Sequence, residues 1–215
     1  DAVHHLGAVL LGVLVIDVGH FVLHAVGAEP LLHLGSEGAV ALMDALTFWK
    51  TVTMDQADLL ERVIALLTDN GIRFCIIGGQ AVNAYVEPLV SLDLDMVVAA
   101  DQIAQAEALL ASEFVVRPFP HSLNVALPGS DLRIQIQTDP RYGDFVTRAA
   151  PQRVLGLTLP VASVEDVMRG KVWAAQDPTR RPSKRQKDLA DIARLLETYP
   201  ELETLVPSEI RSRLL

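Results

Sequence analysis

The sequence of 215 residues contains a single cysteine, Cys75, which excludes a framework of disulfides within the chain and fits a reducing, cytoplasmic compartment. Basic residues are fewer than acidic ones, and the formal net charge is −9. The chain as a whole is therefore not expected to bind polyanions, and a nucleic-acid contact would need a local basic patch.

Long hydrophobic runs are also missing. The apolar run at residues 6–16 stops at Asp17, short of the ~20 residues that span a bilayer, and it lacks the pattern of a signal peptide. We expect no membrane association.

Residues 1–42 differ in composition from the rest of the chain. Five of the six histidines lie there, and Asp17, His20 and His24 would share one face of a helix. Such a face resembles a metal site, but no second ligand cluster accompanies it, and the polar side of an apolar helix is the favoured interpretation. The length allows one domain with an appendage. We predict an N-terminal apolar helical appendage at residues 1–50, a core at residues 51–160 and a helical extension at residues 161–215.

The most informative stretch is at residues 75–98. An apolar run predicts a buried strand, which Gly78 and Gly79 end before a short helix. A proline soon ends that helix, and a second strand begins. In this strand Asp93 and Asp95 alternate with apolar residues, so both carboxylates lie on the same face.

Two carboxylates on alternate residues of one strand lie about 7 Å apart. They repel each other at neutral pH and gain from a divalent cation, and hard oxygen ligands suit Mg²⁺ or Mn²⁺. The Gly-Gly turn leaves backbone N–H groups at a helix start, where a phosphate can bind. Together these features indicate nucleotide chemistry. The alternative is a tight turn followed by the solvent-facing side of an edge strand.

Gly-Gly followed by Asp-x-Asp resembles the signature of the nucleotidyltransferase superfamily, which has the DNA polymerase β-like fold. The resemblance implies an α/β (α+β) protein: a nucleotidyltransferase-like mixed sheet flanked by helices, with a helical C-terminal extension. It implies that Asp93 and Asp95 are catalytic and hold Mg²⁺ or Mn²⁺. It also implies that Gly78, Gly79 and Ser91 bind the nucleotide.

The rest of the pattern predicts the other elements of such a fold. We expect helices that start at caps Asp55, Asp101, Ser163 and Ser183, strands at residues 114–116, 123–127, 132–137 and 154–161, and a hairpin turn at residues 128–130. Cys75 is expected to be a small buried residue.

The strand at residues 132–137 departs from the family pattern. Proteins of this superfamily carry a third aspartate there, and the matching position in this sequence is Gln135. A glutamine oxygen can contact a metal, but it is neutral and cannot act as a base. The change takes the carboxylate set from −3 to −2 and should weaken the binding of a second cation. Gln135 therefore belongs to the predicted catalytic residues, but its lack of charge puts the catalytic activity of the protein in doubt.

The C-terminal part strengthens the resemblance. Lys171 lies on a predicted helix where nucleotidyltransferase-like proteins of the abortive-infection toxin type commonly place a lysine. Residues 187–192, Lys-Asp-x-x-Asp-Ile, are similar to the C-terminal helix motif of those proteins, and five basic residues cluster at 180–187. By this resemblance Lys171, Arg185 and Lys187 bind the nucleotide; the alternative is a solvated lysine and a charged helix start.

The function predicted from these features is metal-dependent transfer of a nucleoside monophosphate from a nucleoside triphosphate to an RNA or protein hydroxyl. The resemblance to toxins also implies tRNA as an acceptor and an antitoxin as a partner. The alternative function is that of a catalytically degenerate member of the same fold, which binds a nucleotide or a partner protein without turnover.

Overall fold

The computed structural model describes residues 56–91, 93–126 and 133–214. The predicted appendage at residues 1–50, with its histidines, lies outside these residues and stays a prediction. So does the predicted hairpin turn at residues 128–130.

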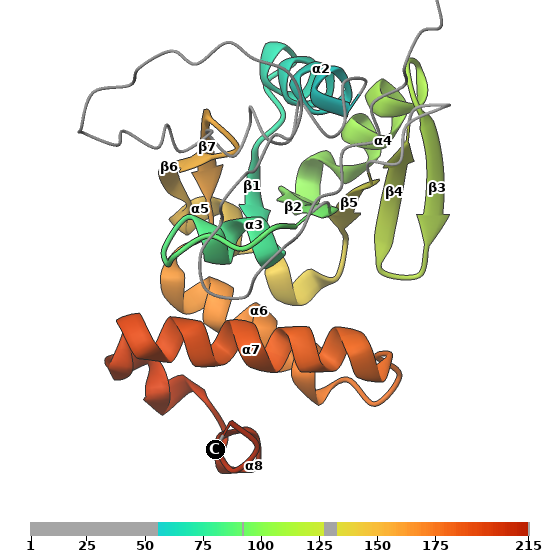
Figure 1. Cartoon of the computed structure of the whole chain (residues 1–215). Coiled ribbons are helices and arrows are strands. Elements are labelled where there is room, and N and C mark those ends of the chain that lie inside the picture. The colour runs from blue at the N-terminus through green and yellow to red at the C-terminus, as the bar shows by residue number, and fades with distance from the viewer. Residues whose placement is uncertain (1–55, 92, 127–132, 215) are drawn as a thin grey trace, which may run out of the picture. The chain divides into compact units, whose positions relative to one another are not determined.

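A seven-stranded mixed sheet forms the centre of the fold, with the strand order β3-β4-β5-β2-β1-β7-β6 (Figure 1). β1 is parallel to β7 and β2 is parallel to β5, while the other neighbouring pairs are antiparallel. The strands are β1 (Phe74–Ile77), β2 (Asp93–Val98), β3 (Val115–Phe119), β4 (Ser122–Ala126), β5 (Arg133–Gln137), β6 (Ala150–Val154) and β7 (Leu157–Val161).

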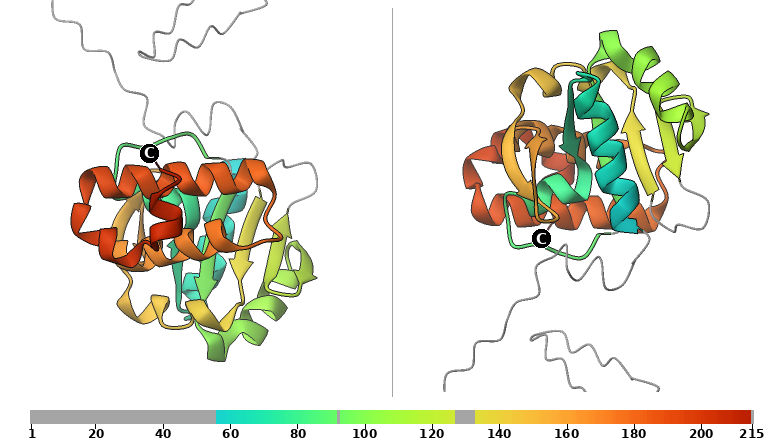
Figure 2. Two further views of the ribbon diagram at one scale, coloured as in Figure 1. Left: turned by 90° about the horizontal axis from the view of Figure 1, so that it is seen from below. Right: turned by 90° about the horizontal axis from the view of Figure 1, so that it is seen from above.

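Helices cover both faces of this sheet. Seen from above, α2 crosses it, and seen from below, α6 and α7 cover it (Figure 2). The α-helices are α2 (Gln56–Asp69), α3 (Gly78–Asn83), α4 (Ile103–Ala111), α5 (Phe145–Arg148), α6 (Val164–Gln176), α7 (Pro182–Thr198) and α8 (Ser208–Arg211). Three 3-10 turns, η1 (Ala100–Gln102), η2 (Pro140–Tyr142) and η3 (Pro200–Leu205), complete the described elements. This architecture confirms the predicted fold class.

The core explains why β2 has two unlike faces. Leu94 and Met96 are fully buried, as are Ile134 and Ile136 on the neighbouring β5. Side chains alternate along a strand, so burying these apolar residues turns Asp93 and the other polar residues of β2 and β5 to the opposite face. The free Cys75 is buried in β1, as predicted, and burial raises its pKa to about 12.

Some local predictions were wrong. The single strand expected at residues 154–161 is part of a hairpin of β6 and β7, whose turn contains Leu155 and Gly156, both with positive φ. Asp101 does not cap a helix; it lies in η1 and pairs with Arg73. Ser183 lies inside α7, because the preceding Pro182 supplies the first helical residue. The predicted cap Ser163 is confirmed, since its hydroxyl accepts a hydrogen bond from the backbone N–H of Asp166.

None of the helices in the described part of the chain is long and apolar enough to cross a membrane.

Candidate active site

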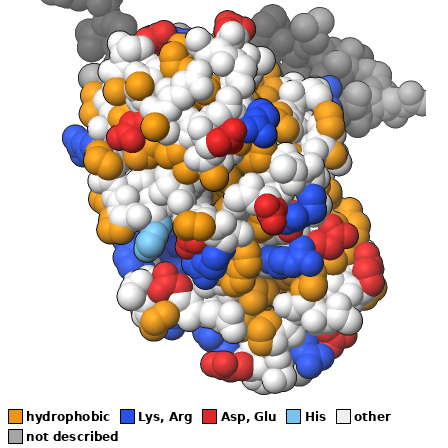
Figure 3. Space-filling model, turned by 180° about the vertical axis from the view of Figure 1, so that it is seen from behind, with side chains coloured by type: hydrophobic (Ala, Val, Ile, Leu, Met, Phe, Trp, Pro, Cys, Tyr) orange, Lys and Arg blue, Asp and Glu red, His pale blue; other side chains and the backbone are white. Residues whose placement is uncertain are grey.

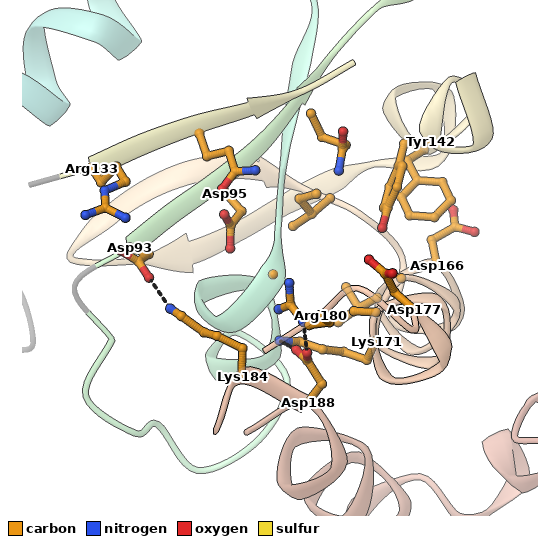
Figure 4. A pocket seen from close by; sticks show the side chains of 18 of the residues that line it. Asp93, Asp95, Arg133, Tyr142, Asp166, Lys171, Asp177, Arg180, Lys184 and Asp188 are labelled. Carbon is orange, nitrogen blue, oxygen red and sulfur yellow. Dashed lines mark hydrogen bonds and ion pairs between the residues drawn. The ribbon is translucent and has the colours of Figure 1, made fainter. Parts of the chain in front are cut away.

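A cavity of about 360 Å³ lies between strands β2 and β5 and helices α6 and α7 (Figure 4). It is highly charged. Five carboxylates and five cationic side chains line it: Asp93, Asp95, Asp166, Asp177 and Asp188, and Arg133, Lys171, Arg180, Arg181 and Lys184. The two sets of charges balance, so the cavity has no net charge of its own. To bind a polyanion, the cavity would therefore need additional positive charge, or its cationic side chains would have to move away from its carboxylates.

Asp93 and Asp95 both point from β2 toward α6 and α7, as the alternation of the strand predicted (Figure 4). Asp93 is half-buried, with 39% of its side chain exposed. Asp95 lies deeper along the same strand, opposite Ile77 of β1. The predicted pair of carboxylates therefore lies at the wall of the cavity.

Gly78 fixes the approach of the chain to Asp95. Its φ is +67°, a conformation that side-chain-bearing residues rarely adopt. A Cβ at Gly78 would lie 2.2 Å from Oδ2 of Asp95, so the position excludes a side chain for a second reason. The turn after β1 is thus built around the carboxylate of Asp95.

Replacing Gly78 by alanine should test this close approach. We expect Gly78→Ala to lower the free energy of unfolding by about 2–4 kcal/mol, from the backbone strain and the displaced carboxylate together. Gly71→Ala is the matched control, because Gly71 has nearly the same φ, +66°, and no atom within 4 Å of the added Cβ. Equal losses in the two variants, measured by urea unfolding, would show that Asp95 does not contribute.

The two carboxylates have opposite electrostatic environments. Burial raises the pKa of Asp95, and the nearby charge of Lys171 offsets this only in part. Partial burial also acts to raise the pKa of Asp93, but the hydrogen bond and charge of Lys184 outweigh it and hold that pKa below its usual value. Among the described residues, none donates a hydrogen bond to the carboxylate of Asp95. Asp95 is the carboxylate left without a hydrogen-bonded partner.

Gln135 lies directly beside Asp95. The parallel pairing of β2 and β5 puts the two residues in register, and Gln135 also lines the cavity. The position expected to supply a third carboxylate is therefore neutral. Within the described ranges no group of three His, Cys, Asp or Glu residues could hold a metal ion.

Lys171 is the centre of a buried ion-pair network. Its Nζ lies 2.7 Å from Oδ2 of Asp191 and 3.2 Å from Oδ1 of Asp188. Arg180 also pairs with Asp188, and Arg194 lies 2.9 Å from Oδ1 of Asp191. Burial acts to lower the pKa of Lys171, but Asp191 and Asp188 outweigh it and raise that pKa. The lysine is therefore charged and rigidly held beside Asp95, and the solvated alternative for it is wrong.

The five basic residues at 180–187 divide into three groups. Arg180, Arg181 and Lys184 line the cavity. Lys187 lies next to the cavity and donates a hydrogen bond of 3.3 Å to Oγ of Ser91. Arg185 binds backbone carbonyls of the loop before α7, those of Asp177, Pro178 and Arg180. Seen from behind, Lys and Arg side chains gather where the sheet meets the C-terminal helices (Figure 3).

The predicted site residues thus separate by position. Gly78, Asp93, Asp95, Gln135 and Lys171 line the cavity. Gly79, Ser91 and Lys187 form a second cluster beside it: the Cβ position of Gly79 is 3.2 Å from Oγ of Ser91 and 3.6 Å from Nζ of Lys187. Gln80 holds this cluster by donating a hydrogen bond of 2.7 Å to the carbonyl of Ser91. Arg185 is not part of either group.

Seven charged residues of the cavity were not among the predicted site residues: Arg133, Asp166, Asp177, Arg180, Arg181, Lys184 and Asp188. A signal for two of them was present. Lys184, Asp188 and Asp191 follow each other at intervals of four and three, which puts them on one face of α7.

Aromatic side chains close the other end of the cavity. Tyr142 and Phe145 line it, and the rings of both pack against Trp173 of α6. Burial raises the pKa of Tyr142 to about 12, so its hydroxyl stays protonated. A Cβ at Gly170 would lie 3.4 Å from the ring of Tyr142, which shows how closely this wall packs against α6.

Two solved structures of one protein, ANT(2″)-Ia, show the same fold. The antibiotic-resistance factor ANT(2″)-Ia in solution is 15% identical with a TM-score of 0.54, over 75% of this chain and 94% of that chain. Its crystal structure in complex with adenylyl-2″-tobramycin is 16% identical with a TM-score of 0.52, over 74% of this chain and 99% of that chain. A putative nucleotidyltransferase from Thermotoga maritima is 12% identical with a TM-score of 0.44, over 64% and 91% of the two chains. No curated protein matches the sequence.

A family model matches more than half of the sequence. It is described as nucleotidyl transferase AbiEii toxin, type IV TA system, and it matches residues 78–214. The match begins at the glycine that contacts Asp95 and includes the strand, the buried lysine and the C-terminal helix described above. The chain belongs to the AbiEii family of nucleotidyl transferase toxins.

Proposed function

We propose that this protein transfers a nucleoside monophosphate from a nucleoside triphosphate to a hydroxyl group of an RNA or a protein. The observation that carries the proposal is the pair Asp93 and Asp95 on one face of β2, in a cavity where Lys171, Arg180 and Lys184 supply positive charge. The membership of the chain in a nucleotidyl transferase toxin family supports it.

The carboxylate pair fits Mg²⁺ or Mn²⁺. Asp95 receives no hydrogen bond from the described residues, its neighbour Gln135 offers an amide oxygen, and all these donors are hard oxygens. Asp93 and Asp95 would hold the ion, which when bound neutralises negative charge on the triphosphate.

The remaining residues would bind and orient the nucleotide. Arg180 and Lys184 face the carboxylates from α7 and the loop before it, and Lys171 is held on α6 by its aspartates. Lys187 and Ser91 would bind phosphate oxygens beside the Gly-Gly turn. In the reaction the acceptor oxygen bonds to the α-phosphorus, the bond from that phosphorus to the β-phosphate oxygen breaks, pyrophosphate leaves, and the hydroxyl proton is released to water.

The partner, the acceptor and the place of action are further parts of the proposal. The family's description as a toxin of a toxin–antitoxin system supports an antitoxin protein as the partner. We propose tRNA as the RNA acceptor to test first, and the cytoplasm as the place of action.

The proposed activity can be tested with each of the four labelled nucleoside triphosphates, Mg²⁺ or Mn²⁺, and total RNA or cell lysate. We expect label in the RNA or protein fraction with the parent, and none with the Asp93→Ala, Asp95→Ala double variant. Labelling that is equal in both proteins would contradict the site.

A second candidate is a catalytically degenerate binder, which the neutral Gln135 beside Asp95 favours. Such a protein would bind metal and nucleotide at the same cavity but transfer nothing in the assay above.

Gln135→Asp decides between the two. We expect it to bind Mn²⁺ roughly tenfold more tightly, because it adds a carboxylate next to Asp95. Without metal it should be less stable than the parent, since like charges then face each other across β2 and β5. Activity that appears only in this variant would identify the parent as a binder. Gln137→Glu is the control: it adds the same charge to the same face, opposite Val97 instead of Asp95.

A further inference from the structure

Lys184 holds the carboxylate that the proposed metal ion would need. Its Nζ donates a hydrogen bond of 2.9 Å to Oδ2 of Asp93, from the first turn of α7 to the first residue of β2. The lysine side chain is 37% exposed and the aspartate 39%, so both have room to move. Of the two carboxylates, Asp93 is therefore hydrogen-bonded to a cation, while Asp95 has no hydrogen-bonded partner among the described residues.

Two other cations near the carboxylates are less able than Lys184 to change partners. Lys171 is buried between Asp188 and Asp191, and Arg180 pairs with Asp188. Lys184 has Asp93 as its hydrogen-bonded partner, and a lysine is a compact charge on a flexible stem. It can leave one anion for another at low cost.

We propose that Lys184 is an exchangeable counter-ion, which occupies Asp93 while the site is empty and moves to the triphosphate when metal and nucleotide enter together. The proposal rests on the proposed function, since it requires the metal site at Asp93 and Asp95. A metal ion alone must displace Lys184 from Asp93 without offering it another anion. A metal ion that arrives with a nucleotide supplies phosphate oxygens to which the same ammonium group can bind.

Two effects of opposite sign follow. Lys184 lowers the affinity for metal alone and raises the affinity for the metal-bound nucleotide, so it couples the two ligands. Removing the lysine should reverse both effects and reduce the coupling.

The experiment compares the parent with Lys184→Met, using Mn²⁺ as the metal. Titrations followed by electron paramagnetic resonance would measure free Mn²⁺, without nucleotide and with a non-hydrolysable nucleoside triphosphate. We expect Lys184→Met to bind Mn²⁺ alone about three- to tenfold more tightly. We expect it to bind the Mn²⁺–nucleotide about tenfold more weakly. Lys184→Gln should behave in the same way.

Arg181→Met is the matched control. Arg181 lines the cavity at the same end of α7 and carries the same charge, but its side chain forms no hydrogen bond or ion pair within the described residues. A tightening of Mn²⁺ binding as large as that in Lys184→Met would show a general effect of charge and overturn the proposal. Unchanged affinity for Mn²⁺ alone in both Lys184 variants would also overturn it.

The Asp93→Ala, Asp95→Ala double variant separates this proposal from the proposed function. Loss of Mn²⁺ binding in the double variant, together with unchanged binding in the Lys184 variants, would overturn the role of Lys184 alone. Mn²⁺ binding retained in the double variant would overturn the metal site and this proposal with it.

Discussion

Asp95→Asn is expected to reduce nucleotide transfer at least about a hundredfold and, in the absence of metal, to make the folded protein more stable. The loss of activity follows from the loss of a charged ligand at the cavity wall. The gain in stability follows from the environment of Asp95. Its folded-state pKa is raised by burial, so as the pH rises above the unfolded pKa the carboxyl group lowers the free energy of unfolding relative to a neutral side chain.

Asp93→Asn is the matched control, and the expected change in stability has the opposite sign. The pKa of Asp93 is lowered because Lys184 outweighs the effect of partial burial, so its charge stabilises the fold above the unfolded pKa and this stability is lost as the pH falls through the folded pKa. The side chain is 39% exposed, so the loss should be less than about 1 kcal/mol. Activity should fall in both variants.

Urea unfolding of the two variants at neutral pH, with and without Mg²⁺, measures these changes. A loss of stability in Asp95→Asn without metal would contradict the unfavourable burial of its charge. Full activity in Asp95→Asn would contradict its role in the site.

The pKa shifts of the two carboxylates of β2 are opposite in sign, raised for Asp95 and lowered for Asp93. Such a difference is typical of a binding site whose ligand is missing. A side chain selected only for stability would resemble Asp93, with a cation beside it. Burial instead opposes the ionisation of Asp95, in a fold that holds Gly78 against it. Unfavourable burial of this kind is common at functional sites, where a ligand supplies the missing partner.

The sequence allowed the central part of the site to be predicted because local rules determine it. Alternation along β2 placed Asp93 and Asp95 on one face, and the Gly-Gly pair marked the turn before them. Even the position of Gln135 could be inferred, because the apolar residues of β5 fix which of its side chains face the cavity.

The ion pairs could not be predicted in the same way. Lys184 and Asp93 are 91 residues apart, and their contact depends on how α7 packs against the sheet. The basic cluster at 180–187 indicated an anion site but did not show that Arg185 binds the backbone of its own loop. The hairpin of β6 and β7 was also missed, because its turn contains a leucine with positive φ, which side-chain preferences do not favour.

Lys171→Met should cause the largest loss of stability among these variants. The lysine is 8% exposed, and its partners Asp188 and Asp191 are 2% and 3% exposed. Without the charge of Lys171, the two arginines of the network, Arg180 and Arg194, face three carboxylates: Asp188, Asp191 and Asp95. Breaking a buried ion pair of this kind costs about 3–5 kcal/mol. We expect a fall of this size in the free energy of unfolding, measured with urea.

A second substitution distinguishes charge from packing. In Lys171→Met, Asp191→Asn the buried charges are again equal in number, and the asparagine can still accept the hydrogen bond from Arg194. The double variant should therefore be more stable than Lys171→Met alone, even though it has one more substitution. If the two losses simply add, the network is not coupled through charge, and Lys171 stabilises the fold by filling space between α6 and α7. If the double variant recovers stability, the charge of its aspartates holds Lys171 at the cavity. The balance of buried charges then contributes more to stability than the packing of these side chains.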